Sequence, residues 1–378
     1  MKKKRILLAA GGTGGHMFPA QALSEVLLKD GWTVGLSTDV RGSRFLDSFP
    51  SDIKVAISDS GTFSSSGIIK KISTPWRIIK GTISTLINFN RERPDVIVGF
   101  GGYPSIPALL TARLLGIPFI LHEQNGILGL VNKIFSKYAN VVACGTWPTS
   151  APEKTNLVFT GNPVRASILK RSGSPYICPG DYPMSMVVVG GSQGATVLSK
   201  IVPIALSKLP LEILKNLRVS HQARSEDIIA VSKCYESMGV QAFVKPFFDD
   251  ISSRYSEAQL VISRSGASSV ADISIIGRPS ILIPFAAAIA DHQSANASQL
   301  KASGGAIVIQ ESELTSEKLA TKITQILMFP EVAQEMANQA FKCGNPNAVE
   351  KLQAVVKSVV DGTSCLLYTS PSPRDGLL

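Results

Sequence analysis

Short apolar runs alternate with amphipathic helical stretches along almost the whole chain, and no other feature restricts the fold as much. This pattern is typical of parallel strands joined by crossover helices, so it predicts an α/β fold. The predicted strands cover residues 5–10, 33–37, 96–100, 118–122, 141–144 and 157–160, and then 185–189, 218–221, 242–244, 260–263, 280–283 and 306–309.

A weak internal repeat divides the pattern into two halves. Residues 5–15 (RILLAAGGTGG) resemble residues 184–194 (MSMVVVGGSQG), and each segment reads as strand, glycine loop and helix. A chain of 378 residues is long enough for two domains. We therefore expect two Rossmann-like domains with parallel sheets that face each other across a cleft, where ligands of such folds bind. The expected boundaries are a first domain at 1–170, a linker at 171–183, a second domain at 184–360 and a disordered or artefactual tail at 361–378.

The composition excludes several classes of protein. With 44% hydrophobic residues, 17% charged residues and 31 glycines, the chain is neither disordered, nor a collagen, nor a small disulfide scaffold. The five cysteines are scattered without a CxxC pair, which argues against a structural zinc site and favours a reducing, cytosolic compartment. No window approaches 18 uninterrupted apolar residues, so no transmembrane helix is predicted.

The positive charge lies almost entirely in the first half. Residues 1–165 hold 19 Lys and Arg against 10 Asp and Glu, a net of +9 out of the +10 of the whole chain. An acidic partner is indicated, either nucleic acid or anionic lipid headgroups. No nucleic-acid-binding module is recognisable.

An amphipathic helix is predicted at residues 74–93. A basic helix with a tryptophan can lie on an anionic bilayer surface, although the same apolar stripe could be ordinary core. The stripe comprises Ile72, Trp76, Ile79, Ile83 and Leu86, of which the first four would make the membrane contact.

Two glycine loops follow predicted strands. Glycines at 11, 12, 14 and 15 precede a helix that should begin near Phe18, so backbone N–H groups would face a polar or anionic ligand, unless the loop is only a tight turn. The dinucleotide fingerprint fails because Met17 replaces its third glycine. The loop at 190–194 lacks the lysine of a P-loop. No cofactor is predicted, and no Asp-x-Asp pair at a strand end indicates a metal.

Polar side chains follow several of the predicted strands. His16 comes directly after the first loop and could take a proton from a substrate hydroxyl, or could simply pack at the helix start. Glu123, at another strand end, could raise its basicity, whereas His122 is expected to be structural. Asp272 could bind a ribose diol or only complement a helix dipole.

Taken together, these motifs resemble the MurG family of bacterial transferases. The stretches GGTGGHMFPA, FGGYPS, HEQNGILGLVNK, GNPVR, GGSQGA, SRSGASSVADI and DHQ occur in the family's order, within residues 4–360. The resemblance implies a GT-B fold and inverting, metal-independent transfer of GlcNAc from UDP-GlcNAc to the muramyl 4-hydroxyl of lipid I, giving lipid II. It also implies a peripheral location at the cytoplasmic face of the cell membrane, with its anionic surface and cell-wall or division proteins as partners.

The resemblance also implies roles for individual residues. His16 is the expected base, and Tyr103 and Glu123 match positions for acceptor binding or catalysis. Asp272 departs from the family pattern, since a glutamate usually binds the ribose there. The expected donor contacts are Thr13, Gly14, Gly15, Asn125, Arg165, Ser192 at the diphosphate, Phe248 beside the uracil, Asp272, and Gln293 at the GlcNAc hydroxyls.

Other functions remain open from the sequence. A UDP-GlcNAc 2-epimerase or a glycolipid synthase of the same fold is the main alternative enzyme, although an epimerase has no need of a basic tryptophan helix. A non-catalytic nucleotide-sugar-binding scaffold at the membrane is the alternative from another class. An NAD-dependent oxidoreductase is disfavoured by the failed fingerprint.

Overall fold

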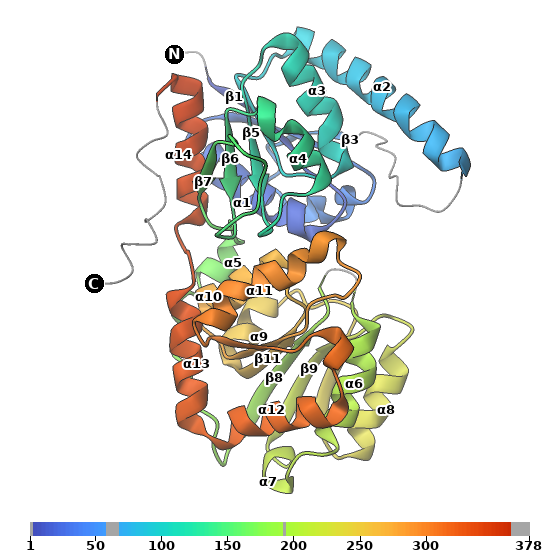
Figure 1. Cartoon of the computed structure of the whole chain (residues 1–378), viewed down its shortest axis with the longest axis vertical. Coiled ribbons are helices and arrows are strands. Elements are labelled where there is room, and N and C mark those ends of the chain that lie inside the picture. Colours follow the sequence, from blue (N-terminus) through green and yellow to red (C-terminus); the bar gives the residue numbers. More distant parts are fainter. Residues whose placement is uncertain (1–2, 58–67, 192–193, 364–378) are drawn as a thin grey trace. The chain divides into compact units, whose positions relative to one another are not determined.

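A computed structural model describes residues 3–57, 68–191 and 194–363 of the chain (Figure 1). The chain forms two compact units: the first contains residues 1–165 and 347–378, and the second contains residues 166–346. Each unit is built around one parallel sheet with helices on its faces. Among the described residues, no helix is long and apolar enough to cross a membrane.

The first unit holds a seven-stranded parallel sheet in the order β3-β2-β1-β4-β5-β6-β7. The central strands are almost fully buried, as expected for a parallel sheet covered on both faces. The strands are β1 (Arg5–Ala9), β2 (Thr33–Thr38), β3 (Lys54–Ile57), β4 (Val96–Gly99), β5 (Phe119–Glu123), β6 (Val141–Cys144) and β7 (Leu157–Phe159).

Helices cover both faces of this sheet. On one face, α1 and α14 share a core that includes Leu23, Leu27, Leu352 and Val355. On the other face, α2, α3 and α4 contribute buried side chains such as Phe89, Leu109 and Phe135. The bounds are α1 (Gly14–Lys29), α2 (Ile68–Arg91), α3 (Ile106–Leu115), α4 (Leu130–Phe135) and α14 (Ala348–Asp361), with short 3₁₀ turns η1 (Gly42–Ser48), η2 (Tyr103–Ser105) and η3 (Ser136–Tyr138).

The second unit holds a six-stranded parallel sheet in the order β10-β9-β8-β11-β12-β13. Its main core lies between the sheet and helices α6, α8, α12 and α13. The strands are β8 (Met184–Val189), β9 (Leu217–Gln222), β10 (Gln241–Lys245), β11 (Ala258–Ser263), β12 (Ser280–Leu282) and β13 (Ala306–Val308). The helices are α5 (Ala166–Leu169), α6 (Thr196–Leu206), α7 (Leu211–Leu214), α8 (Ile228–Ser237), α9 (Ile251–Glu257), α10 (Ala267–Ile276), α11 (His292–Ala302), α12 (Ser316–Met328) and α13 (Pro330–Lys342), with η4 (Ile289–Asp291) and η5 (Glu311–Glu313).

The predicted α/β class and every predicted strand are confirmed, with differences in detail. The edge strand β3 was not predicted, because its side chains are all exposed and show no buried pattern. Helix α1 begins at Gly14, before the expected Phe18, so Gly14 and Gly15 lie in its first turn. Helix α2 begins at Ile68, before the expected residue 74.

The units also differ from the expected domain boundaries. Residues 171–183 were expected to be a linker, but they pack on the second unit: the buried Arg278 donates to the carbonyls of Ser174 and Pro175, and the Tyr176 hydroxyl donates to the Gln259 carbonyl. Helix α14 belongs to the first unit, because its apolar side chains fill that unit's core. The expected tail falls mostly outside the described residues.

Candidate functional site

In each sheet the strand order reverses once, and the polar motifs lie at these reversals. In the first sheet the reversal lies between β1 and β4; in the second, it lies between β8 and β11. Open α/β sheets bind ligands outside the carboxyl ends of their strands at such points. The loops at 10–13 and 100–102 follow β1 and β4, and residues 190–191 and 264–266 follow β8 and β11.

His16 lies in the first turn of α1, and its hydrogen bond defines its tautomer. Its Nδ1 is 2.9 Å from the Gly11 carbonyl oxygen. A carbonyl can only accept, so Nδ1 carries the proton and the neutral ring keeps a lone pair on Nε2. This arrangement gives the imidazole an atom that can take a proton from a ligand.

A glycine pair allows the loop after β4 to approach His16. Gly101 and Gly102 have φ angles of +86° and +73°, which residues other than glycine rarely adopt. A Cβ on Gly102 would lie 3.2 Å from His16 Cε1. Tyr103 follows this pair, begins η2 and is half-buried.

A missed residue, Asp39, holds the first glycine loop in place. Its buried Oδ1 accepts from the backbone N–H groups of Gly12 (2.8 Å) and Gly42 (2.9 Å), and its Oδ2 accepts from Arg41 Nε (3.0 Å). A Cβ on Gly11 would lie 2.7 Å from the same Oδ1, so a side chain there has no room. The sequence signal was an aspartate two residues after the end of a predicted strand.

His122, at the end of β5, is a structural residue, as expected. Burial lowers the pKa of its imidazole to about 4, and the Gly161 carbonyl opposes this shift only in part. Gln124 Nε2 donates to its Nδ1 at 3.1 Å. The ring is therefore neutral at physiological pH and fully enclosed.

Glu123, the neighbouring residue, bonds to its own loop. Its side-chain oxygens accept from the backbone N–H groups of Asn125 and Gly129 and from the side-chain amides of Asn125 and Asn132, at 2.9 to 3.1 Å. None of these hydrogen bonds is to His16. Among the described residues, no direct contact between Glu123 and His16 therefore supports the expectation that this carboxylate raises the basicity of His16.

Arg165 lies against α1. Its guanidinium carbon is 4.3 Å from the centre of the Phe18 ring, and Phe18 in turn packs edge-on against Phe45. A cation over an aromatic face is held without losing its hydrogen-bonding edge. The structure thus brings Thr13, Gly14, Gly15, His16, Tyr103, Glu123, Asn125 and Arg165 to the carboxyl-terminal edge of the first sheet.

In the second unit, Ser192 lies outside the described residues, but the start of its loop is described. A Cβ on Gly190 would lie 2.3 Å from the Ala195 nitrogen, so only glycine fits where the loop returns to α6. Gln222 Nε2 donates to the Gly191 carbonyl at 2.9 Å and to the Pro246 carbonyl at 3.1 Å.

The N-terminus of α10 has buried hydroxyls without partners. Ser265 and Ser268 each have a buried Oγ with no hydrogen bond to any described residue. A Cβ on Gly266, between them, would meet open space. Asp272 lies in the second turn of this helix and is 8% exposed.

A further missed residue, Arg264, fixes the loop that precedes α11. Its buried guanidinium donates to the carbonyls of Ile283 (3.2 Å) and Pro284 (3.1 Å) and to Glu311 (2.8 Å). Burial raises the pKa of Glu311, but the hydrogen bonds from Arg264 and from the Ala286 N–H outweigh it, so the pKa lies below its usual value.

Gln293, in the first turn of α11, is oriented by the same loop. The Phe285 N–H donates to its Oε1 at 3.0 Å. The side chain can therefore offer its Nε2 amide to a ligand oxygen.

The two adjacent phenylalanines before α9 differ in exposure. Phe248, the expected apolar contact, is 4% exposed, and Arg254 lies 4.3 Å from its ring centre. Phe247 is 46% exposed. A ligand can reach the ring of Phe247, whereas that of Phe248 is covered; sequence alone did not distinguish them.

Three residues of the stripe on α2 are exposed and are not core, whereas Leu86 is half-buried. Trp76, Ile79 and Ile83 are 73%, 49% and 52% exposed, while Phe89 and Thr82 face the unit's interior. The side chain of Ile72 lies outside the described residues. A second basic and apolar surface, which was not predicted from the sequence, lies at the end of α3 and on α4. Its exposed apolar residues are Leu114, Leu130 and Ile134, and its basic residues are Arg113, Lys133 and Lys137.

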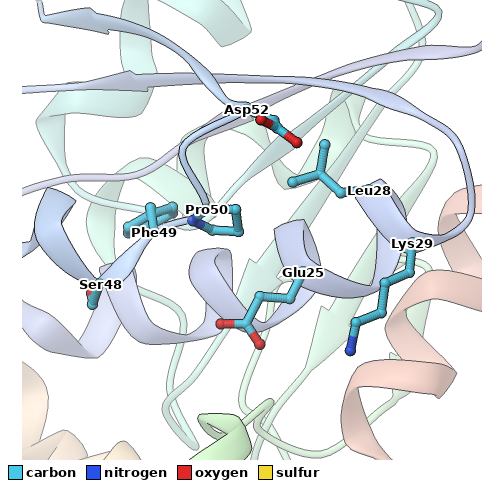
Figure 2. A pocket seen from close by; sticks show the side chains of 7 residues that line it. All are labelled: Glu25, Leu28, Lys29, Ser48, Phe49, Pro50 and Asp52. Carbon is cyan, nitrogen blue, oxygen red and sulfur yellow. The ribbon is translucent and has the colours of Figure 1, made fainter.

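A hollow of about 550 Å³ lies elsewhere on the first unit, between the end of α1 and residues 48–52 (Figure 2). No residue of the site described above lines it; its walls are Glu25, Leu28, Lys29, Ser48, Phe49, Pro50 and Asp52. Within the described ranges, His, Cys, Asp and Glu side chains form no cluster of three that could hold a metal ion.

Comparison with known proteins gives matches over both units. Residues 6–144 match the glycosyltransferase family 28 N-terminal domain, and residues 185–352 match the family 28 C-terminal domain. A UDP-N-acetylglucosamine--N-acetylmuramyl-(pentapeptide) pyrophosphoryl-undecaprenol N-acetylglucosamine transferase of Rhizobium meliloti is 43% identical over 96% of this chain and 98% of its own. The Brucella canis protein of the same name is 40% identical over 94% of each.

Solved structures agree with these matches. MurG of Acinetobacter baumannii is similar with a TM-score of 0.75 and 31% identity, over 94% of this chain and 99% of its own. A putative UDP-N-acetylglucosamine 2-epimerase of Listeria monocytogenes, with a TM-score of 0.67 and 15% identity over 96% and 98% of the chains, shows a shared fold alone.

Proposed function

Because the chain belongs to the MurG family of N-acetylglucosamine transferases, we propose that it moves GlcNAc from UDP-GlcNAc to the muramyl 4-hydroxyl of lipid I, giving lipid II for peptidoglycan synthesis. The observation that carries the proposed mechanism is the hydrogen bond from His16 Nδ1 to the Gly11 carbonyl. It leaves Nε2 as the atom that takes the acceptor's proton.

The transfer inverts the anomeric carbon in a single displacement. The acceptor's 4-oxygen forms a bond to the anomeric carbon of GlcNAc while the bond from that carbon to the UDP oxygen breaks. The hydroxyl proton passes to His16 Nε2, and the electron pair of the broken bond leaves with the diphosphate. Tyr103, which follows the Gly101–Gly102 pair, contacts the acceptor in this proposal.

The donor binds to the second unit in this proposal. The leaving diphosphate lies at the N-terminus of α10, where the hydroxyls of Ser265 and Ser268 and the open space at Gly266 support an anion site, and at the loop that holds Ser192. Helix N-termini then stabilise the charge that a metal ion would otherwise neutralise. Gln293 donates to the sugar hydroxyls, and Asp272 accepts hydrogen bonds from the ribose hydroxyls. The exposed Phe247 lies beside the uracil, where Phe248 was expected.

The remaining donor contacts come from the first unit. The guanidinium of Arg165 packs on the face of the Phe18 ring, and Asn125 lies in the loop after β5, where its side-chain amide donates to Glu123. Thr13 caps α1, and its N–H donates to the Gly11 carbonyl. The first turn has no acidic residue and no side-chain cap, so the N–H groups of Gly14 and Gly15 can donate to a negatively charged ligand.

We also propose that the first unit lies on the anionic cytoplasmic face of the cell membrane. The support is the exposed face of α2 with Trp76, Ile79 and Ile83, to which Ile72 would belong, together with the net positive charge of residues 1–165. The basic and apolar surface on α3 and α4 has the same chemistry. Such surfaces combine apolar burial with attraction to anionic headgroups.

The test is transfer of labelled GlcNAc from UDP-GlcNAc to a lipid I analogue in EDTA, with wild type and His16→Ala. We expect transfer by the wild type without added metal, and a loss of about 100- to 10,000-fold in kcat for the variant, the range for removing a general base. UDP affinity should stay within about twofold. Absence of transfer by a wild type that binds UDP would instead support an epimerase or a binding scaffold.

A further inference from the structure

The side chain of Glu123 has all its accepting positions occupied. The residue is 2% exposed and ends strand β5. Its Oε1 accepts from the N–H and Nδ2 of Asn125, at 3.1 and 2.9 Å, and its Oε2 accepts from the Gly129 N–H and Asn132 Nδ2, both at 2.9 Å. A carboxylate has about four lone-pair sites, and four donors fill them. A group that takes a substrate's proton needs a lone pair directed at the substrate.

These four bonds fix the loop between β5 and α4 at both ends. Two of the bonds hold Asn125, near the start of the loop, and one holds Gly129, the residue before α4. The bond to Asn125 Nδ2 also sets the orientation of that amide, so it decides which atoms of Asn125 face a ligand.

The fourth bond extends toward His16. Asn132, which is 1% exposed, donates from the same Nδ2 to the His122 carbonyl at 3.2 Å. Its amide lies against Gly101, where an added Cβ would be 3.2 Å from Nδ2. The next residue, Gly102, lies against the His16 ring. A continuous series of contacts therefore runs from Glu123 to His16, without a direct bond between them.

We propose that Glu123 is a positioning residue that takes no part in proton transfer. Through Asn125 it presents the loop that binds the donor, and through Asn132 it supports the Gly101–Gly102 segment that lies against His16. This inference rests on the proposed roles of His16 and Asn125. It differs from the expectation that Glu123 acts in catalysis or raises the basicity of the histidine.

The experiment measures kcat/KM for GlcNAc transfer against pH in Glu123→Gln, Asn132→Ala, the double variant and wild type. The amide of Glu123→Gln sets an NH₂ group against two of the four donors, so we expect about a 100-fold fall in kcat/KM, the cost of a misplacement near 1 Å. The KM for UDP-GlcNAc should rise, and the acidic limb of the profile should stay at the wild-type pH. The double variant should be little worse than Glu123→Gln, since both changes break one network.

The matched control is Glu153→Gln, which changes an exposed carboxylate of the same unit and should leave every parameter at the wild-type value. The proposal is overturned if Glu123→Gln removes the acidic limb, or if the losses of the two single variants multiply in the double variant. Should Glu123→Gln not fold, Asn132→Ala decides: an unchanged kcat/KM and KM would also overturn the proposal. Failure of the proposed function would appear as no transfer by wild type and control alike.

Discussion

At the residue scale, the enclosed His122 makes the first unit sensitive to acid. Its pKa is lowered to about 4 by burial, whereas an unfolded histidine titrates near 6.5. Because the folded pKa is the lower one, the unfolded chain binds more protons below pH 6.5, so stability falls as the pH drops from about 6.5 to 4.

Between pH 6 and 5 we therefore expect the unfolding free energy of the first unit to fall by about 1 kcal/mol more in the wild type than in His122→Asn. Urea unfolding followed by tryptophan fluorescence measures it, because all three tryptophans, at 32, 76 and 147, lie in this unit. Equal slopes in the two proteins would contradict the expectation.

Single residues also show where sequence reasoning ends. The glycine loops and the polar residues at strand ends could be placed from sequence, because strand, loop and helix have local signals. The four donors around Glu123 could not, since two are main-chain N–H groups positioned by the path of a loop. Phe247 and Phe248 are equally apolar, and only the folded structure shows that Phe248 is buried, with Arg254 over its ring, while Phe247 is exposed.

At the scale of elements, helix α2 carries the clearest prediction. Replacing Trp76 and Ile79 with serine removes exposed apolar surface without touching the buried Phe89, so binding to anionic phospholipid vesicles should weaken at least about tenfold. Vesicle co-sedimentation measures this, with UDP affinity as the property that should not change. The matched control is Ile204→Ser, an exposed apolar residue of the second unit. Equal vesicle binding by the variant and wild type would remove the proposed membrane contact.

Elements were predictable where burial leaves a pattern. The central strands read as continuous apolar runs, but β3 pairs with β2 while exposing Val55 and Ile57, so its signal is hydrogen bonding that a sequence does not display. The buried residues of α14 recur at helical spacing, but this spacing does not indicate which sheet the helix covers.

At the scale of the whole molecule, the chain leaves the first unit and returns to it. Leu352 of α14 is fully buried in the first unit's core, so Leu352→Ala should cost that unit about 2 to 5 kcal/mol. Tryptophan fluorescence should show an earlier urea transition, while the second unit's contribution to far-ultraviolet circular dichroism should not move. An earlier transition of the second unit alone would contradict this assignment of α14.

The return of α14 also affects the order in which the molecule can assemble during synthesis. The second unit is one continuous segment, 166–346, whereas the first needs residues made after all of these. During synthesis on a ribosome, the unit that is begun first is therefore completed last. Until α14 has been made, one face of its sheet is not fully covered. A nascent chain at this stage exposes apolar surface that chaperones recognise. The first unit, although it is translated earliest, is therefore the unit that needs chaperone binding for longest.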